Sequence, residues 1–193
     1  MRLFVALDID PTIRERIARF LEGVREFAPH ARWVSAESLH ITLKFIGEQP
    51  DQKLDSIKTA LAGIHSLPTD LNFRGYGFFP TARSARVFWI GVDADERLAQ
   101  LASLVEQALE PFGIKREAHG FSPHLTLARG KSAAPQPRHD VRPNRNFQRL
   151  QEKLDALPTP EFGTMTAREF FLYQSKLSPA GSQYTKLQRF PLL

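Results

Sequence analysis

Two histidine–threonine pairs are the part of this sequence that could carry chemistry. His40 stands two residues before Thr42, and His124 stands two residues before Thr126, 84 positions later (124 − 40). Side chains alternate along a strand, so each histidine shares a face with its threonine while apolar neighbours point the other way. The chain holds six histidines. A matched pair among so few indicates a shared task.

The two pairs predict proton-transfer chemistry. Imidazole gains or loses a proton near neutral pH, so two imidazoles across a cleft can act as a general acid and a general base. The two hydroxyls can donate hydrogen bonds to charged oxygens between them. This arrangement suits in-line displacement at phosphorus. The spacing predicts the pair but does not assign the two roles, and two buried structural histidines are the simpler alternative.

Other chemistries find little support in the sequence. The chain has no cysteine, which removes disulfides, thiolate nucleophiles and cysteine-bound zinc. No His-x-His or His-Glu-x-x-His motif occurs, and Asp8 and Asp10 at a strand end fit turn chemistry. Gly130-Lys131-Ser132 imitates the end of a P-loop, but Leu125 stands where the first glycine belongs. We therefore expect neither a metal nor a cofactor.

Composition is ordinary for a globular protein, with 42% hydrophobic and 24% charged residues. No apolar run reaches the length of a membrane-spanning helix, and the N-terminus reads as a first strand rather than a signal peptide. We expect a cytoplasmic monomer that does not bind membranes.

The motifs need strands to hold them, and the hydrophobic pattern supplies these. Strands are expected over 3–9, 32–34, 39–46, 72–79, 85–92, 168–173 and the second motif, with helices over 10–27, 51–62, 96–109 and 147–157. Each half reads as helix, His-Thr strand, helix, strand, which indicates internal duplication. We predict an α+β fold in one domain over 1–193. Two pseudo-symmetric lobes, each an antiparallel sheet with helices on its outer face, would surround a central cleft.

A basic, proline-rich stretch interrupts the second half. The net charge is +5, and between Arg129 and Arg149 six basic residues accompany one acid, Asp140. Prolines at 135, 137 and 143 favour a loop over about 130–145. This loop is either a solvated surface insertion or an arm that contacts nucleic-acid phosphates.

The chain resembles the two-histidine (2H) phosphoesterase superfamily, and within it the bacterial RNA 2',3'-cyclic phosphodiesterases, formerly called 2'-5' RNA ligases. The resemblance covers nearly the full length and rests on both motifs with their flanks. The matching segments are residues 2–7, 32–48, 77–80, 85–92, 121–129 and 175–187. The stretch after Arg129 is longer than the family usually has, which affects the rim of the cleft rather than the chemistry.

The resemblance implies that His40 is the proton donor and His124 the proton acceptor. Water would attack the cyclic phosphate, the 3'-oxygen would leave, and a 2'-phosphate would remain, with Thr42 and Thr126 holding non-bridging oxygens. The implied substrates are RNA with 2',3'-cyclic phosphate ends or small cyclic nucleotides.

Further contacts with substrate are predicted from position and charge. Lys44 shares strand parity with His40 and is expected to face the cleft. Arg129 has the opposite parity to His124, so a phosphate contact and a surface salt bridge are equally open. Three aromatic residues could stack on a base or belong to the core: Phe79, Phe121 and Tyr184.

Two other functions remain open at this point. The same site run backward would be a ligase that joins a 2',3'-cyclic end to a 5'-hydroxyl. The chain could also be a non-catalytic module that binds RNA ends, although binding alone would not require a matched acid and base.

Overall fold

The computed structural model describes residues 1–130, 143–179 and 181–193, so most of the predicted basic loop lies outside the described residues. The chain forms two antiparallel sheets. The first has the order β3-β1-β8-β9, with β1 (Arg2–Asp8), β3 (His40–Glu48), β8 (Glu169–Ser178) and β9 (Gly181–Pro191). The second has the order β2-β6-β5-β4-β7, with β2 (Arg32–Trp33), β4 (Thr69–Phe79), β5 (Val87–Ala94), β6 (His124–Arg129) and β7 (Glu161–Ala167).

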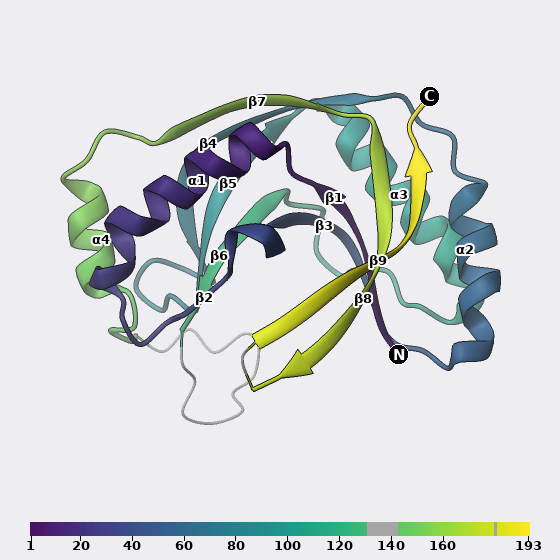
Figure 1. Ribbon diagram of the computed structural model, residues 1–193, viewed down its shortest axis with the longest axis horizontal. Coiled ribbons are helices and arrows are strands. Elements are labelled where there is room, and N and C mark those ends of the chain that lie inside the picture. The colour runs from purple at the N-terminus through teal and green to yellow at the C-terminus, as the bar shows by residue number, and fades with distance from the viewer. Residues whose placement is uncertain (131–142, 180) are drawn as a thin grey trace.

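In the described ranges, four α-helices accompany the sheets: α1 (Pro11–Val24), α2 (Leu54–Ala62), α3 (Glu96–Leu109) and α4 (Gln148–Asp155). Asp10 caps α1 by accepting a hydrogen bond from the Thr12 amide, and Pro11 opens the helix as expected. Helices α1 and α4 lie at one end of the molecule, and α2 and α3 lie at the other (Figure 1).

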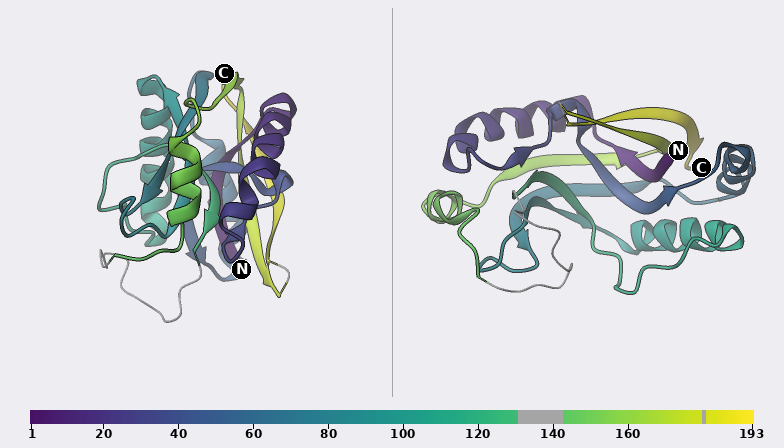
Figure 2. Two further views of the ribbon diagram at one scale, coloured as in Figure 1. Left: turned by 90° about the vertical axis from the view of Figure 1, so that its left-hand side faces the viewer. Right: turned by 90° about the horizontal axis from the view of Figure 1, so that it is seen from below.

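Each sheet has one face covered by helices. Helix α1 contacts β7 of the second sheet, and α3 contacts β3 of the first. Seen from below, α1 and α3 lie on opposite sides of the molecule (Figure 2). The apolar residues of the two motif strands supply the covered faces, because Ile41, Leu125 and Leu127 are completely buried. The histidine faces therefore point away from the helices.

The two motif strands share one burial pattern, which supports internal duplication. From the histidine onward, both β3 and β6 read half-buried, buried, half-buried, buried, buried, exposed. The two strands belong to different sheets but contact each other. This contact brings the two motifs to the middle of the molecule.

The predicted α+β fold of two lobes is confirmed, but two strands were missed. Strand β7 was not expected because Gly163, with φ +106°, interrupts its pattern. Strand β9 was not expected because most of its side chains are exposed and show no apolar alternation. Helix α1 ends at Val24, and a 3-10 turn (Arg25–Phe27) completes the range predicted as helical. No helix in the described ranges is long and apolar enough to cross a membrane.

Candidate active site

The two histidines are anchored in the same way. His40 places Nδ1 2.8 Å from the carbonyl oxygen of Ser38, and His124 places Nδ1 2.8 Å from that of Ser122. A carbonyl can only accept, so Nδ1 carries the proton and donates in both rings. Nε2 is then the atom that exchanges a proton with a ligand. Both imidazoles are half-buried, and Thr42 and Thr126 share their faces.

His124 lies close enough to His40 to affect its ionisation. Burial lowers the pKa of His40, and so do the charges of Arg129 and His124, against the raising effects of the Ser38 hydrogen bond and the Asp8 charge. Burial also lowers the pKa of His124, and Arg129 adds to the shift against the hydrogen bond to Ser122. The positive charge of Arg129 therefore acts on both rings.

A bulge in each motif strand sets the direction of the side chains beyond the threonine. The pairing of β3 with β1 shifts between Ala6↔Thr42 and Val5↔Lys44. The pairing of β6 with β5 shifts at the equivalent place, between Trp89↔Thr126 and Phe88↔Ala128. An extra residue in a strand reverses the alternation beyond it. The fifth residue after each histidine, Phe45 or Arg129, thus returns to the histidine face.

Lys44 does not face the cleft, so the expectation from strand parity is wrong. The bulge turns its side chain to the helix side, where Nζ lies 2.7 Å from Glu106 Oε1 and 2.7 Å from the carbonyl oxygen of Lys115. Only 2% of Lys44 is exposed. It is a paired cation between β3 and α3 rather than a substrate contact.

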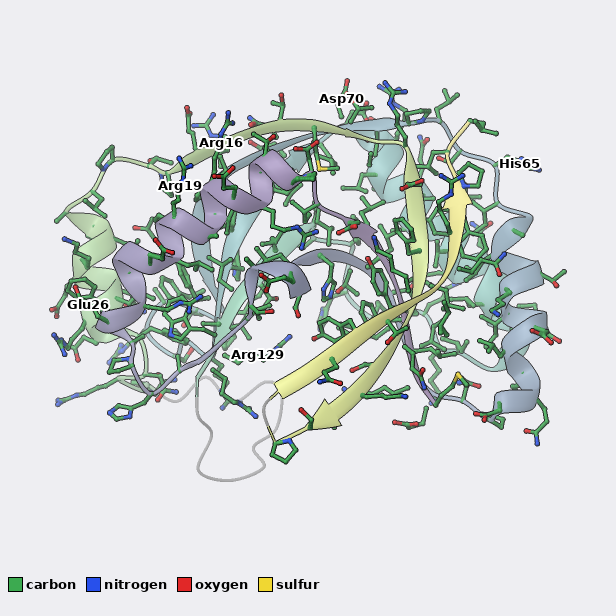
Figure 3. The ribbon with its side chains drawn as sticks, in the orientation of Figure 1. Arg16, Arg19, Glu26, His65, Asp70 and Arg129 are labelled. Atoms are coloured by element: carbon green, nitrogen blue, oxygen red, sulfur yellow. The ribbon has the colours of Figure 1, made fainter. Side chains whose placement is uncertain are left out.

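Arg129 lies near both histidines, in surroundings that favour the binding of an anion. Its side chain extends from the end of β6 toward the β8–β9 hairpin (Figure 3), and no carboxylate in the described part of the chain pairs with it. Partial desolvation lowers the pKa of its guanidinium, and the charges of Arg32 and Arg2 do the same, against that of Tyr184. Arg129, Arg32 and Arg2 thus gather positive charge near the two histidines.

Aromatic rings flank each histidine. Phe79 meets His124 edge-on with ring centroids 5.0 Å apart, and Trp89 packs against Phe79 at 5.0 Å. Tyr184 meets His40 edge-on at 5.1 Å, and Phe4 lies 4.8 Å from the same ring. The structure thus brings Phe79 and Tyr184 to the site.

Phe121 and Phe45 differ from expectation. Phe121 packs against the hydrophobic core, so we do not assign it a contact with substrate. The exposed Phe45, at 53%, was missed because simple alternation pointed it away from His40. Its ring lies 6.0 Å from Phe4 on the histidine face.

A cavity of about 900 Å³ opens beside His40. One wall comes from the turn before β3, including Ser35 and Ser38, and the other from β9, including Gln183, Tyr184 and Lys186. Its volume is in the range of sites that take small organic ligands. No group of three or more metal-ligating side chains occurs among the residues that the structure describes.

Comparison with known proteins shows the family to which this fold and its paired His-x-Thr strands belong. A family profile described as "2'-5' RNA ligase superfamily" matches residues 10–176. The chain belongs to this superfamily, as its sequence motifs predicted.

Named relatives cover almost the whole chain. An RNA 2',3'-cyclic phosphodiesterase of Archaeoglobus fulgidus is 36% identical over 98% of this chain and 99% of its own length. One of Thermotoga maritima is 30% identical over 97% of this chain and 93% of its own. Among solved structures, E. coli LigT complexed with 3'-AMP is 29% identical, with a TM-score of 0.77 over 99% of this chain and 97% of that one.

Proposed function

We propose that this protein hydrolyses RNA 2',3'-cyclic phosphate ends to 2'-phosphomonoesters, with His40 as general acid and His124 as general base. The observation that carries the proposal is the matched anchoring of the two imidazoles. Each is held at Nδ1 by the carbonyl two residues earlier, which leaves both Nε2 atoms for proton transfer. Arg129 provides positive charge that acts on both rings.

The reaction needs one proton accepted and one donated. Water attacks phosphorus while its proton passes to Nε2 of His124. The bond from phosphorus to the 3'-oxygen breaks, and Nε2 of protonated His40 gives its proton to that oxygen. The products are a 3'-hydroxyl and a 2'-phosphate, and exchange with solvent restores both histidines. Thr42 and Thr126 donate hydrogen bonds to the non-bridging oxygens, whose charge grows at the transition state.

The assignment of the acid also orients the substrate. The 3'-oxygen belongs to the ribose, so the ribose must lie on the His40 side and the water on the His124 side. The 900 Å³ cavity opens on the His40 side, and its walls carry hydroxyl, amide and aromatic groups that a nucleoside could contact, together with the charged side chains of Asp8, Arg14, Glu37 and Lys186. We place the terminal nucleoside there, with Tyr184 beside the ribose or base. Phe79 stays next to the base catalyst, His124.

The enzyme class has independent support. Four relatives between 30% and 36% identical to the chain, over nearly its full length, are named RNA 2',3'-cyclic phosphodiesterase. The chain is accordingly an enzyme of this class. Beyond this class, we propose the identity of the acid and of the base, the product and the orientation of the substrate.

The direct test is incubation with an oligonucleotide that carries a 2',3'-cyclic phosphate, with and without a second oligonucleotide that carries a 5'-hydroxyl. We expect a 2'-phosphate product in both, because water greatly outnumbers RNA ends. Joined product as the main species would favour the ligase. Binding without any product would favour an RNA-end binding module.

Hydrolysis is expected to survive an excess of EDTA with less than about a twofold change, because two histidines perform both proton transfers. The measurement is the initial rate on a cyclic mononucleotide before and after dialysis against EDTA. Loss of the rate and its return with a divalent ion would contradict the two-histidine mechanism.

The threonines are expected to matter less than the histidines. Thr42→Ala and Thr126→Ala should each lower kcat by about tenfold to a hundredfold, since each removes one neutral hydrogen bond to the phosphoryl group. Thr59→Ala is the matched control, because its hydroxyl donates to the Asp55 carbonyl on α2, outside the site. Equal kcat in all three variants would remove the hydroxyls from the mechanism.

A further inference from the structure

The two histidines are anchored alike but face different neighbours across their sheets. In the pairing of β3 with β1, the residue opposite His40 is Asp8. In the equivalent pairing of β6 with β5, the residue opposite His124 is Gly91. In the strand pairing, a carboxylate thus stands opposite the histidine that we assign as the acid, whereas a glycine stands opposite the histidine that we assign as the base.

Gly91 cannot be exchanged for a residue with a side chain at little cost. A Cβ at this position would lie 2.6 Å from the carbonyl oxygen of Arg74 on the neighbouring strand β4. This distance is shorter than real Cβ contacts, and the obstacle is backbone, which cannot move aside easily. The backbone itself therefore keeps an acid away from the position opposite His124.

Asp8 is held firmly in its place. Its Oδ1 accepts hydrogen bonds from the Ile9 amide, at 2.8 Å, and from Arg14 Nη2, while Oδ2 accepts from Lys186 Nζ. Burial alone would raise the pKa of the Asp8 carboxyl, but the hydrogen bonds from Lys186 and Ile9 and the charges of Lys186 and Arg14 keep it below its ordinary value. Asp8 is ionised at neutral pH as a result.

Arg14 links Asp8 to the backbone that holds His40. Its Nη1 donates a 2.7 Å hydrogen bond to the carbonyl of Ala36, at the start of the 3-10 turn Ala36–Ser38. The carbonyl of Ser38, at the end of this turn, accepts from Nδ1 of His40. Asp8 therefore affects His40 in two ways. Its charge acts on the ring, and its contact with Arg14 supports the 3-10 turn whose Ser38 carbonyl holds Nδ1 of His40.

Both negative and positive groups surround His40. The titratable and charged groups near the ring are Asp8 on β1, Arg14 on α1, Glu37 in the 3-10 turn, His124 and Arg129 on β6, Tyr173 on β8, and Tyr184 and Lys186 on β9. Arg129 and His124 favour the neutral imidazole, whereas the charge of Asp8 favours the protonated one. Asp8 is the carboxylate paired opposite His40, and its charge raises the pKa of that ring.

We infer that Asp8, held by Arg14 and Lys186, is a positioning residue that makes His40 the acid of the pair. This inference rests on the proposed function and deepens it.

The physical reason lies in how two coupled histidines share one proton. With a single proton on the pair, the enzyme exists either with His40 protonated and His124 neutral, or the reverse. Only the first form can hydrolyse the cyclic phosphate in the assigned direction. A negative charge beside His40 and none beside His124 favours the first form. Without Asp8, the charge of Arg129 would favour a neutral His40.

The test compares Asp8→Asn with Glu169→Gln, which removes a carboxylate paired with Arg189 on the same sheet. For Asp8→Asn we expect kcat to fall about tenfold, KM to change less than about threefold, and the high-pH limb of the rate profile to move to lower pH. The pKa of His40, followed by NMR titration of the substrate-free enzyme, should fall, while that of His124 should move less. Glu169→Gln should match the wild type.

A second variant keeps the inference testable if Asp8→Asn does not fold. Lys186→Gln removes a cation that pairs with Asp8, so the high-pH limb and the pKa of His40 should move upward, opposite to the first variant. Loss of packing alone would move both variants in the same direction. An unmoved or falling His40 pKa in Lys186→Gln, or an unmoved one in folded Asp8→Asn, would overturn the inference. If the wild type has no hydrolytic activity, the proposed function fails, while the titration still decides the role of Asp8.

Discussion

Replacing His40 by alanine is expected to lower kcat on a 2',3'-cyclic mononucleotide by about a hundredfold to ten-thousandfold, the usual scale for loss of a general acid. The physical reason is that the departing 3'-oxygen would leave as an alkoxide with no proton donor beside it. His124→Ala should cause a loss of similar size, because water would attack without a base. The double variant should fall by much less than the product of the single effects, since both groups act on one transition state.

The pH profile should separate the two roles. Wild-type kcat/KM is expected to be bell-shaped. As pH falls, His124 takes up a proton and can no longer accept one, which gives the low-pH limb. As pH rises, His40 loses its proton and can no longer donate one, which gives the high-pH limb. Burial lowers the pKa of both rings, so the maximum should lie on the acidic side of the ordinary histidine range.

Each alanine variant should lose one limb of this profile. His40→Ala should lose the high-pH limb and His124→Ala the low-pH limb. His65→Ala is the matched control, because His65 is exposed and lies far from the site, at the opposite end of the molecule from α4 (Figure 3). A folded His40→Ala or His124→Ala enzyme with near-normal turnover would show that the paired motif is structural.

The sequence predicts the directions of side chains in this site only where the motif strands alternate regularly. His40, Thr42, His124 and Thr126 were predicted correctly to share faces, because the first three residues of each motif strand alternate without interruption. Beyond the threonine, a bulge in each strand reverses the alternation, and the sequence carries no glycine or other signal there. The reversal in β3 turns Lys44 to the helix side, and the reversal in β6 turns Arg129 to the histidine face.

Asp8 shows a second limit of sequence reading. At a strand end it looked like a turn residue, and its place opposite His40 depends on the register of β1 with β3. Register between distant strands depends on packing across the whole sheet, which no local pattern reveals. Strand β9, which supplies Tyr184 and Lys186, escaped prediction because its exposed side chains lack periodicity.

Arg129→Gln is expected to lower kcat/KM for a cyclic mononucleotide by about a hundredfold to a thousandfold, the scale seen when an electrostatic stabiliser of a developing charge is removed. The cyclic phosphate is an anion, and Arg129 lies among Arg2, Arg32 and the two histidines with no described carboxylate as partner. Its guanidinium should therefore bind the phosphate rather than a protein acid. Glutamine removes the charge but keeps a polar group of comparable reach.

Two further variants give this result its meaning. Arg129→Lys should recover part of the rate, because it restores the charge but not the planar pair of donors that fits a phosphate. Arg19→Gln is the control for total charge, since Arg19 lies on the outer side of α1 in an exposed pair with Glu15. If Arg129 binds the substrate anion, the wild-type KM should rise with ionic strength more steeply than that of Arg129→Gln, because the variant has one charge fewer to be screened. An Arg129→Gln enzyme whose kcat/KM lies within about threefold of the wild-type value, and whose KM depends on salt as that of the wild type does, would contradict this prediction. The histidines and threonines alone would then bind the phosphate.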